Sequence, residues 1–368
     1  MKVPIYRLLY DQKYRDKFQE HCKKIFDKGF LTNDDFVQEF EKQFSSWTKA
    51  SFSLAVGNGT AALEAILRAI DVNGYEVILP TNTFVATAVA VKNAGGIPVF
   101  ADIESKYASL DPNQAESKIT KKTKAILTVH IGGLISPAIL DLQNLCSKKG
   151  LALIEDCAHA HGCTFDGIHA GLFGSGGTFS FFTTKVMTTG EGGMVITPSL
   201  ELSKKLTSIR QFGKQEDNPI SHERDGNNLK MTEFQAALGL LEIERASERI
   251  QKRQDIAEHY HKRLQHSLWN PLRHHQQSTC SYYKQILWPK SVQRSDLQNY
   301  LLKNSVQLTG GVYNIPLHRQ PLFKNQYRDE NFPIANHFAD NHVCPPCYSD
   351  LTLDEAETVC QLLLEYAP

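Results

Sequence analysis

The stretch Ala125-Ile-Leu-Thr-Val-His130 is followed by Ser136-Pro-Ala-Ile-Leu-Asp-Leu-Gln-Asn-Leu-Cys-Ser-Lys-Lys-Gly150 and then by Leu151-Ala-Leu-Ile-Glu-Asp156. Each apolar run predicts a buried strand. The middle segment predicts a helix, because its first two residues suit the N-cap and the first helical position and its glycine suits the position just past the end. A strand, a helix and a strand at this spacing indicate a right-handed βαβ unit. We therefore expect an α/β fold with a largely parallel central sheet flanked by helices.

The alternation of strands and helices continues on both sides of this unit. Apolar runs predict further strands near residues 53–56, 76–80 and 97–102. Thr232 and Gln235 form a capping box that predicts the start of a long helix, and its charged continuation is expected to connect two domains. We place a large α/β domain at residues 1–245 and a smaller α+β domain at residues 246–368, with residues 1–25 packed on the smaller one.

Two ionisable residues stand where an open α/β sheet binds ligands. Asp156 ends one predicted strand, and Lys185 ends the run Thr178-Phe-Ser-Phe-Phe-Thr-Thr-Lys185, which predicts a buried strand before a tight loop. Burial would favour the neutral, nucleophilic amine that a Schiff-base lysine needs. The protonated ring nitrogen of pyridoxal phosphate would give the buried carboxylate a partner. Together the two residues indicate a pyridoxal phosphate site, although a lysine that extends to solvent from a strand end fits the second stretch alone equally well.

A phosphate cradle is a second candidate feature. The run Ser53-Leu-Ala-Val-Gly-Asn-Gly-Thr60 leads into an apolar pattern at positions 63, 66, 67 and 70, so a helix is predicted to begin near Thr60. A strand, a glycine-rich turn and a helix start present free N–H groups at a positive dipole end, which makes Gly59 and Thr60 candidates for a phosphate. A glycine-rich turn with Thr60 as N-cap explains the same pattern.

Histidines near Asp156 have two interpretations. His159 could hydrogen-bond a cofactor substituent or orient the aspartate, and it could equally be satisfied by backbone groups. His161 is expected to be structural. No third ligand at recognisable spacing accompanies the His159-x-His161 pair, so no metal site is predicted.

Several motifs in matching order resemble the DegT/DnrJ/EryC1/StrS family of sugar aminotransferases, which are pyridoxal phosphate enzymes of fold-type I. The motifs are Glu155-Asp-Cys-Ala-His-Ala-His-Gly162, Phe179-Ser-Phe-Phe-Thr-Thr-Lys185 and Thr189-Gly-Glu-Gly-Gly-Met-Val195. The similarity extends from about Phe30 to the end of the sequence. It implies that Lys185 binds the cofactor and that Asp156 keeps its ring nitrogen protonated.

The resemblance also implies roles for residues outside these two. It assigns Gly59, Thr60 and Ser180 to the cofactor phosphate, and Phe84 to the face of the pyridine ring. Strand alternation alone would put Ser180 and Lys185 on opposite faces, so the shared role implies a bend before the lysine.

More distant residues acquire roles in the same way. Asn228 lies in the segment that, in the family, reaches the phosphate of the neighbouring subunit, so the resemblance implies a homodimer with shared active sites. Tyr313 and His318 lie in a segment similar to one near the family's substrate channel, and both are candidate substrate contacts.

The implied reaction moves an amino group from L-glutamate to a keto group of a nucleotide-linked deoxysugar, with pyridoxamine phosphate as the intermediate form of the cofactor. Lys185 would shuttle the proton between the donor and the cofactor. Family members that are dehydratases carry histidine in place of this lysine, so Lys185 argues against that reaction. A cyclitol or a small phosphorylated ketone as acceptor, and a non-catalytic regulatory protein that binds pyridoxal phosphate, remain alternatives. A dinucleotide-binding oxidoreductase would need a Gly-x-Gly-x-x-Gly context that the sequence lacks.

Composition excludes other classes of partner. The 368 residues carry 40 basic and 40 acidic side chains, so no net field favours nucleic acid or an anionic membrane. The N-terminal residues Met1-Lys-Val-Pro-Ile-Tyr-Arg7 lack the apolar core of a signal peptide, and no apolar run is long enough to span a membrane. Eight scattered cysteines in a chain of this size are typical of reduced thiols. We therefore expect a cytoplasmic protein.

Overall fold

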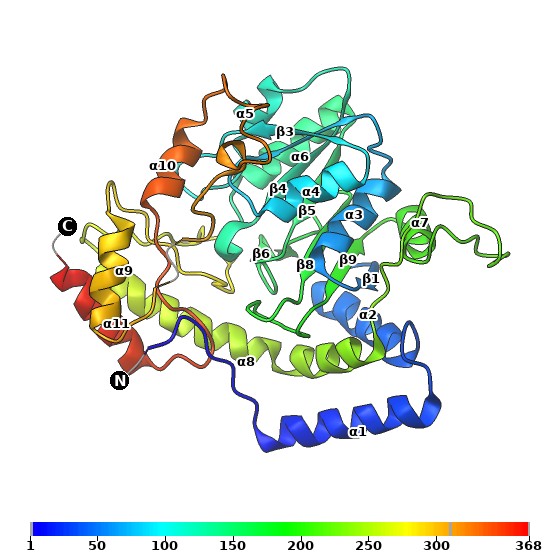
Figure 1. Cartoon of the computed structure of the whole chain (residues 1–368), viewed down its shortest axis with the longest axis horizontal. Helices are drawn as coiled ribbons and strands as arrows, with labels where there is room; N and C mark the ends of the chain where they lie inside the picture. Colours follow the sequence, from blue (N-terminus) through cyan, green and yellow to red (C-terminus); the bar gives the residue numbers. More distant parts are fainter. Residues whose placement is uncertain (1–2, 309–310, 367–368) are drawn as a thin grey trace.

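A seven-stranded sheet forms the centre of the computed structural model, which describes residues 3–308 and 311–366 (Figure 1). Its strand order is β1-β9-β8-β5-β4-β2-β3. Neighbouring strands pair in parallel from β8 to β3, whereas β9 runs antiparallel to both β8 and β1. The bounds are β1 (Phe52–Val56), β2 (Glu76–Pro80), β3 (Ile97–Ala101), β4 (Thr123–Val129), β5 (Ala152–Asp156), β8 (Gly176–Ser180) and β9 (Gly193–Thr197). The prediction of a largely parallel α/β sheet is confirmed, and the strand that ends in Asp156 is its central strand.

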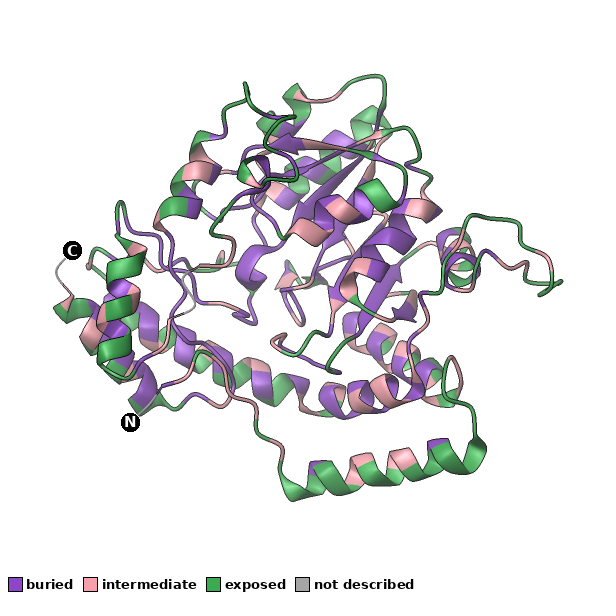
Figure 2. Cartoon of the chain, in the orientation of Figure 1, coloured by how far each residue is buried: buried purple, intermediate pink, exposed green. Residues whose placement is uncertain are grey.

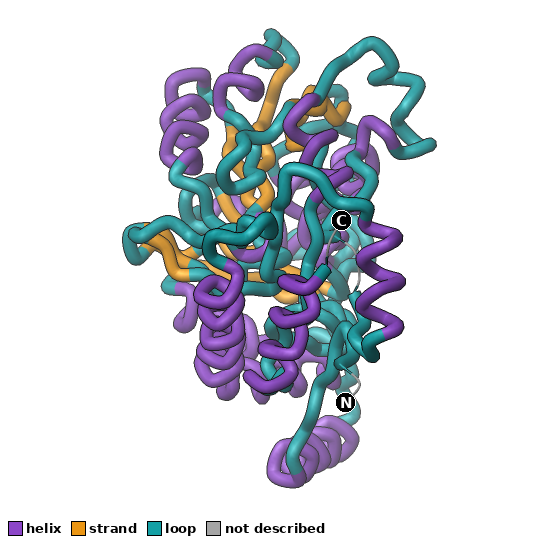
Figure 3. Tube along the Cα trace, turned by 90° about the vertical axis from the view of Figure 1, so that its left-hand side faces the viewer, coloured by secondary structure: helices purple, strands orange, loops and turns teal. Residues whose placement is uncertain are grey.

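Helices surround this sheet, and Figure 3 shows the strands lying between them. A small second sheet joins β6 (Thr164–Phe165), β7 (Ile168–His169) and β10 (Ser278–Thr279). The α-helices of the described ranges are α1 (Gln12–Lys28), α2 (Asp35–Thr48), α3 (Gly59–Ala69), α4 (Val85–Asn93), α5 (Pro112–Ser117), α6 (Ala138–Lys149), α7 (Leu200–Arg210), α8 (Glu233–Leu264), α9 (Arg294–Lys303), α10 (Pro333–Asn341) and α11 (Leu353–Glu365). None of these helices is long and apolar enough to cross a lipid bilayer.

The sheet separates two hydrophobic cores, because successive side chains of a strand point to opposite faces. On β2, Val77 and Leu79 belong to one core and Ile78 to the other. The same alternation holds along β4, β5 and β9. Strands that are buried on both faces explain why the apolar runs in the sequence are almost uninterrupted, and Figure 2 shows the sheet as buried while the outer face of α1 is exposed.

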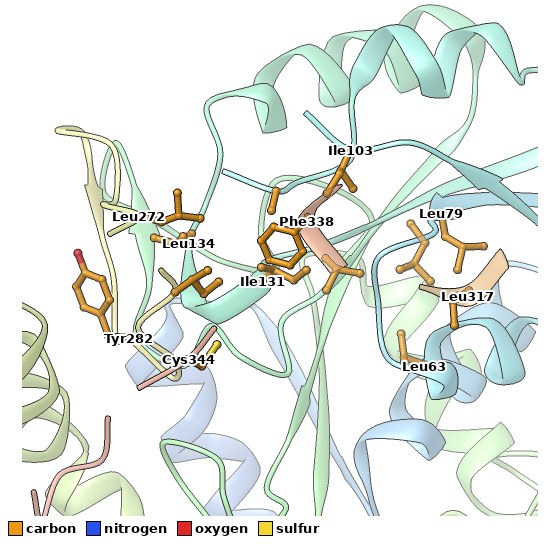
Figure 4. Close-up of a cluster of buried hydrophobic side chains, with 14 of the residues drawn as sticks. Leu63, Leu79, Ile103, Ile131, Leu134, Leu272, Tyr282, Leu317, Phe338 and Cys344 are labelled. Carbon is orange, nitrogen blue, oxygen red and sulfur yellow. The ribbon is translucent and has the colours of Figure 1, made fainter. Parts of the chain in front are cut away.

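One of the cores extends from the sheet into the C-terminal part of the chain. Figure 4 shows Leu79 and Ile131 in the same cluster as Leu272, Phe338 and Cys344. Position 245 lies inside the continuous helix α8, whose first half packs on α2 and whose second half packs on α11. The N-terminal segment also reaches this part of the chain, since Arg7 forms an ion pair with Glu355 at 2.6 Å. The division into domains at residues 245 and 246 stays a prediction.

A buried acid on α8 connects three separate elements. Glu242 is fully buried and accepts hydrogen bonds from the Tyr14 hydroxyl at 3.0 Å and from the Thr188 N–H at 3.2 Å. Arg249, seven residues further along α8, forms an ion pair with Glu242, with its Nη1 2.7 Å from Oε2. Burial raises the pKa of Glu242, and Arg249 opposes that shift. The pair therefore holds α1 and the loop after Lys185 against α8.

Replacing Arg249 with methionine is expected to lower the free energy of unfolding at pH 7 by about 3–5 kcal/mol, because an uncompensated carboxylate remains buried. Since burial raises the pKa of Glu242, the loss should shrink as the pH falls and the carboxylate takes up a proton. Urea denaturation at pH 7 and at a mildly acidic pH measures both effects. Lys252→Met, which removes an exposed pair with Glu248 on the same helix, is the control and should cost at most about 1 kcal/mol. Equal losses in the two variants would contradict the role of the buried pair.

Candidate active site

A cavity of about 820 Å³ lies where β5 and β8 end and α3 begins. It brings together eight of the residues predicted from the sequence: Gly59, Thr60, Phe84, Asp156, His159, Ser180, Lys185 and Tyr313. This position agrees with the rule that open α/β sheets bind ligands outside the carboxyl ends of their strands.

The N-terminus of α3 forms one wall of the cavity. The helix begins at Gly59, and Asn58 is its N-cap, because the Asn58 side chain accepts from the Ala61 N–H at 2.9 Å. Thr60 is therefore inside the first turn and is not the cap. The N–H groups of Gly59 and Thr60 have no acceptor within the helix, as is usual for the first turn. A Cβ at Gly59 would lie 2.7 Å from the Cβ of Ser180, so glycine is what allows the helix start and the strand end to meet.

We expect Gly59→Ala to weaken binding of pyridoxal phosphate by about 10-fold or more, because the added methyl group displaces Ser180 from the helix start. The dissociation constant can be measured by titrating the cofactor-free protein and following quenching of protein fluorescence. Gly57→Ala is the matched control, since a Cβ at Gly57 would meet its nearest neighbour, the Lys230 carbonyl, at an ordinary 3.4 Å. Equal affinities in the wild type and Gly59→Ala would show that the close approach is not needed for binding.

Asp156 is the buried acid of the site. Its Oδ2 accepts from the Thr87 hydroxyl at 3.0 Å and its Oδ1 accepts from the Ala158 N–H at 3.1 Å. Burial raises its pKa, while these two hydrogen bonds and the positive charge of Lys185 act in the opposite direction. Among the described residues, no basic side chain lies within ion-pair distance of its carboxylate. A buried carboxylate without a cationic partner suits a ligand that brings its own positive charge.

The loop that carries Lys185 differs in one respect from the prediction. Strand β8 ends at Ser180, and the chain turns so that the Lys185 N–H donates to the Phe182 carbonyl at 2.9 Å. The expected buried strand up to the lysine is therefore wrong, whereas the bend that the resemblance implied is present. Because of this bend, Ser180 and Lys185 line the same cavity.

The environment of Lys185 is only partly dry. Its side chain is half-buried, and its ammonium group lies 4.5 Å from the centre of the Tyr283 ring. Contacts from distant segments fix the loop around it. The Tyr6 hydroxyl donates to the Thr183 carbonyl, and the hydroxyl groups of Thr184 and Tyr283 lie 3.0 Å apart.

His159 is held by two hydrogen bonds, neither of which involves Asp156. The Gly132 N–H donates to its Nδ1 at 3.3 Å, so its Nε2 carries the proton and faces the Tyr313 hydroxyl at 3.3 Å. Burial, followed by the charges of Lys185 and Lys284, lowers its pKa well below the ordinary value. The imidazole is therefore neutral, and it stacks on Tyr283 with ring centres 4.2 Å apart.

Two aromatic residues predicted from the sequence lie at the mouth of the cavity. Phe84 stands just before α4 and is 59% exposed in the single chain. Its ring is stacked with that of Tyr313 at 6.4 Å. A ring this exposed beside a cavity is available to a flat ligand or to a second protein chain.

Two predicted residues do not line the cavity. His318 is buried, and its ring nitrogens face the Thr81 hydroxyl at 2.7 Å and the Asn336 side chain at 3.0 Å. Asn228 lies at the base of the loop between α7 and α8, where its backbone pairs with Gln211, and the middle of this loop projects away from the body of the chain (Figure 1). Its side chain accepts from Lys230 at 2.5 Å. Within one chain, Asn228 is therefore not part of the site.

The structure adds three residues for which the sequence contains no signal. Thr87 binds Asp156 from α4, and Tyr283 and Lys284 line the cavity from an irregular segment near β10. Burial raises the pKa of the Tyr283 phenol, but the charges of Lys185 and Lys284, together with the Thr184 hydrogen bond and the charge of Arg253, hold this pKa below the ordinary value. A short irregular segment more than 90 residues from Lys185 has no periodicity from which its position could be predicted.

The geometry fits pyridoxal phosphate. The helix start with its free N–H groups suits a phosphate, and the buried acid suits a protonated ring nitrogen. Lys185, which forms no ion pair with any residue that the structure describes, suits the aldehyde. These features on a largely parallel sheet define a pyridoxal phosphate enzyme of fold-type I.

The comparisons with known proteins identify the family. The model of the DegT/DnrJ/EryC1/StrS aminotransferase family matches residues 12–364. The chain is 32% identical to a GDP-perosamine synthase of Vibrio cholerae, over 99% of each chain. It is also 32% identical to a dTDP-3-amino-3,6-dideoxy-alpha-D-galactopyranose transaminase of Aneurinibacillus thermoaerophilus, over 97% of each. The crystal structure of DesV from S. venezuelae superposes with a TM-score of 0.91 at 25% identity, covering 97% of this chain and 96% of DesV.

The chain therefore belongs to the DegT/DnrJ/EryC1/StrS aminotransferase family. It is an aminotransferase, and its cofactor is pyridoxal phosphate.

Proposed function

We propose that the protein transfers an amino group from L-glutamate to a keto group of a nucleotide-linked deoxysugar. The observation that carries the proposal is that Lys185 and Asp156 line one cavity whose wall is the start of α3. The substrate class is supported by the names of two relatives, a GDP-perosamine synthase and a dTDP-linked amino sugar transaminase. Location in the cytoplasm stays a prediction from the sequence.

Each residue has a role that follows from its surroundings. Gly59, Thr60 and Ser180 hold the phosphate, because they place N–H and hydroxyl donors at the positive end of α3. Asp156 keeps the ring nitrogen protonated, and Phe84 covers one face of the ring. His159 is neutral, and the Gly132 N–H fixes its orientation, so it lines the cavity as a hydrogen-bonding group and does not transfer protons.

Bound pyridoxal phosphate supplies the electron sink and stores the amino group between the two half-reactions. In the first half-reaction L-glutamate gives up its amino group and becomes 2-oxoglutarate with uptake of one water, and in the second the ketone receives the amino group with release of one water. Lys185 removes the proton from the donor Cα and, in the second half-reaction, delivers a proton to the carbon that receives the amino group. Tyr283 orients the lysine, because its ring lies against the ammonium group and its hydroxyl is held by Thr184.

The acceptor class is tested with the amine-loaded enzyme. Nucleotide-linked ketosugars, a cyclitol ketone and a small phosphorylated ketone are each added, and return of the pyridoxal phosphate absorbance band is followed. The proposal expects the band to return with a nucleotide-linked ketosugar at a rate at least 10-fold above that with the other ketones. Return with the other ketones alone would contradict the substrate class. A bound chromophore without turnover on any of them would favour a regulatory protein.

We also propose a homodimer in which Asn228 reaches the cofactor phosphate of the neighbouring chain. Supporting observations are the projecting loop between α7 and α8, the 89% exposure of Ile220 within it, and the exposed rings of Phe84 and Phe182 beside the cavity. Large apolar side chains left exposed in this way mark surfaces that another chain covers.

Mixing two inactive variants tests the shared site. Lys185→Ala and Asn228→Asp chains, each with low activity alone, should regain activity when they are mixed and allowed to exchange, because one site of each mixed dimer then has both native residues. Asn228→Asp places a carboxylate against the cofactor phosphate, and the repulsion between the two negative charges is expected to weaken binding of the cofactor. No recovery in a mixture shown to contain mixed dimers would mean that each site is contained in one chain.

A further inference from the structure

Lys284 is the second cation of the active-site cavity. Among the described residues that line the cavity, Lys185 and Lys284 are the lysines, and arginine is absent. In the proposed reaction, Lys185 binds the cofactor and transfers the proton. Lys284 is half-buried, and within residues 3–308 and 311–366 its ammonium group has neither an ion pair nor a hydrogen bond. A half-buried cation in this position is available to an anionic group of a ligand.

The acids that line the cavity do not account for Lys284. Asp156 is bound by Thr87 and Ala158 and faces the cofactor nitrogen. Glu64 is paired with Arg68 at 3.0 Å. The acidic lining residue that remains, Glu191, is exposed in the loop after Lys185 and forms no ion pair or hydrogen bond with Lys284. The charge of Lys284 therefore has no counterpart in the described part of the protein.

The position of Lys284 relative to the reacting centre is fixed by Tyr283. The ammonium groups of Lys185 and Lys284 lie 4.5 and 5.4 Å from the centre of the same Tyr283 ring. Arg253 holds this segment to α8 and to the Cys347 carbonyl, to which it donates at 2.7 Å, and it also reaches the Tyr283 carbonyl. The two ammonium groups therefore lie in one region of the cavity, beside a single aromatic ring.

We propose that Lys284 binds the α-carboxylate of the amino donor. This assignment rests on the proposed function, and it specifies which residue recognises the donor. The α-carboxylate is bonded directly to the carbon from which Lys185 removes a proton, so it is the anionic group nearest to that lysine. The diphosphate of a nucleotide-linked sugar is separated from the reacting carbon by atoms of the sugar ring, and the cofactor phosphate is held at the start of α3. Neither of these groups suits a cation placed beside Tyr283.

Lys284→Met keeps the length of the side chain and removes the charge. The concentration of L-glutamate that gives half the maximal rate of the first half-reaction should rise by about 10- to 100-fold, which is the loss of one charge-assisted hydrogen bond. Binding of 2-oxoglutarate to the pyridoxal phosphate form, measured by calorimetry without turnover, should weaken by a similar factor. The second half-reaction, started from the amine-loaded enzyme and a ketosugar that the wild type uses, should keep its dependence on ketosugar concentration within about 3-fold.

Lys290→Met is the matched control, because Lys290 is exposed on the same segment and does not line the cavity. Lys284→Arg should recover part of the affinity for L-glutamate. If the wild type reacts with L-glutamate and Lys284→Met shows the same dependence on it, the assignment of Lys284 is wrong and the proposed function stands. A loss confined to the ketosugar would assign Lys284 to the acceptor instead. If the wild type neither reacts with L-glutamate nor binds 2-oxoglutarate, the proposed donor fails, and the assignment fails with it.

Discussion

Replacing Lys185 with alanine is expected to lower the rate of amino transfer by about 10⁴-fold or more. The side chain has two tasks in the proposed reaction, since it holds the cofactor covalently and moves the proton at the reacting carbon. The other groups near the cavity cannot replace it. His159 is neutral, and its Nε2–H faces the Tyr313 hydroxyl. Lys284 contacts the Tyr283 ring at a greater distance than Lys185 does, 5.4 Å against 4.5 Å, and it has a different role in our proposal.

The measurement combines kinetics with a test of covalent attachment. Wild-type protein treated with borohydride should retain the cofactor through denaturation, and Lys185→Ala should release it. Lys185→Arg is the informative control, because it keeps a positive charge beside Tyr283 but offers no nucleophilic amine. It should be as inactive as the alanine variant. A cofactor that stays covalently bound to Lys185→Ala would identify another lysine, and Lys284 would be the first to examine.

The sheet could be predicted because its signals are local. Ser136, Pro137 and Gly150 frame α6 within one residue of its observed bounds, and the capping box of Thr232 and Gln235 starts α8. Asp156 was placed correctly because the strand that it ends is buried on both faces, and such strands leave uninterrupted apolar runs in the sequence. These features depend on residues close together in the chain.

The end of β8 was not predictable in the same way. Phe179 and Phe181 are buried, but Phe182 is 43% exposed, and no local pattern distinguishes the third phenylalanine from the other two. The turn depends on contacts from far along the chain, among them the Tyr6 hydroxyl on Thr183 and the Glu242 carboxylate on Thr188. Tertiary contacts of this kind override strand propensity. The family resemblance predicted the bend because related chains with the same motif share the folded arrangement that such contacts produce.

Neither the local sequence pattern nor the family resemblance predicted that Tyr283 and Lys284 line the cavity. These residues lie in a segment without regular structure, and Arg253, buried on α8, holds it in place through carbonyl groups. Backbone carbonyls leave no trace in the sequence of side chains. The residues that set the electrostatics of the cavity are therefore partly those that only the folded chain brings to it.

Burial of Asp156 favours binding of the cofactor but lowers the stability of the cofactor-free protein. In the folded protein without cofactor, burial raises the pKa of Asp156 above the value that it has in the unfolded chain, about 4. A carboxyl group with a raised pKa stabilises the fold fully below the unfolded value, and this contribution is lost as the pH rises through the folded value. At neutral pH the charged carboxylate is thus a net cost to the cofactor-free protein, and the protonated ring nitrogen offsets that cost when the cofactor binds.

Asp156→Asn is therefore expected to have opposite effects on activity and stability. Amino transfer should fall by about 10²- to 10³-fold, because the neutral amide no longer stabilises the protonated ring nitrogen. Without cofactor, the variant should melt at a higher temperature than the wild type at pH 7, and the difference should vanish toward about pH 4, where the wild-type carboxyl group is also neutral. The amide can keep the hydrogen bond from Ala158, and the Thr87 hydroxyl can turn toward Thr83, which lies 2.9 Å away.

Calorimetry of the cofactor-free proteins across this pH range, together with single-turnover kinetics of the loaded proteins, measures both sides. Thr87→Val is the matched control, since it removes a hydrogen bond to the carboxylate but leaves the charge, and it should lower stability without the pH-dependent gain. A variant Asp156→Asn that is less stable than the wild type at every pH would mean that the buried carboxylate stabilises the fold. Asp156 would then be a structural residue, and the ring nitrogen of the cofactor would need a different partner. A variant that is more stable but nearly inactive would show that the charge of Asp156 destabilises the cofactor-free protein and is required for amino transfer.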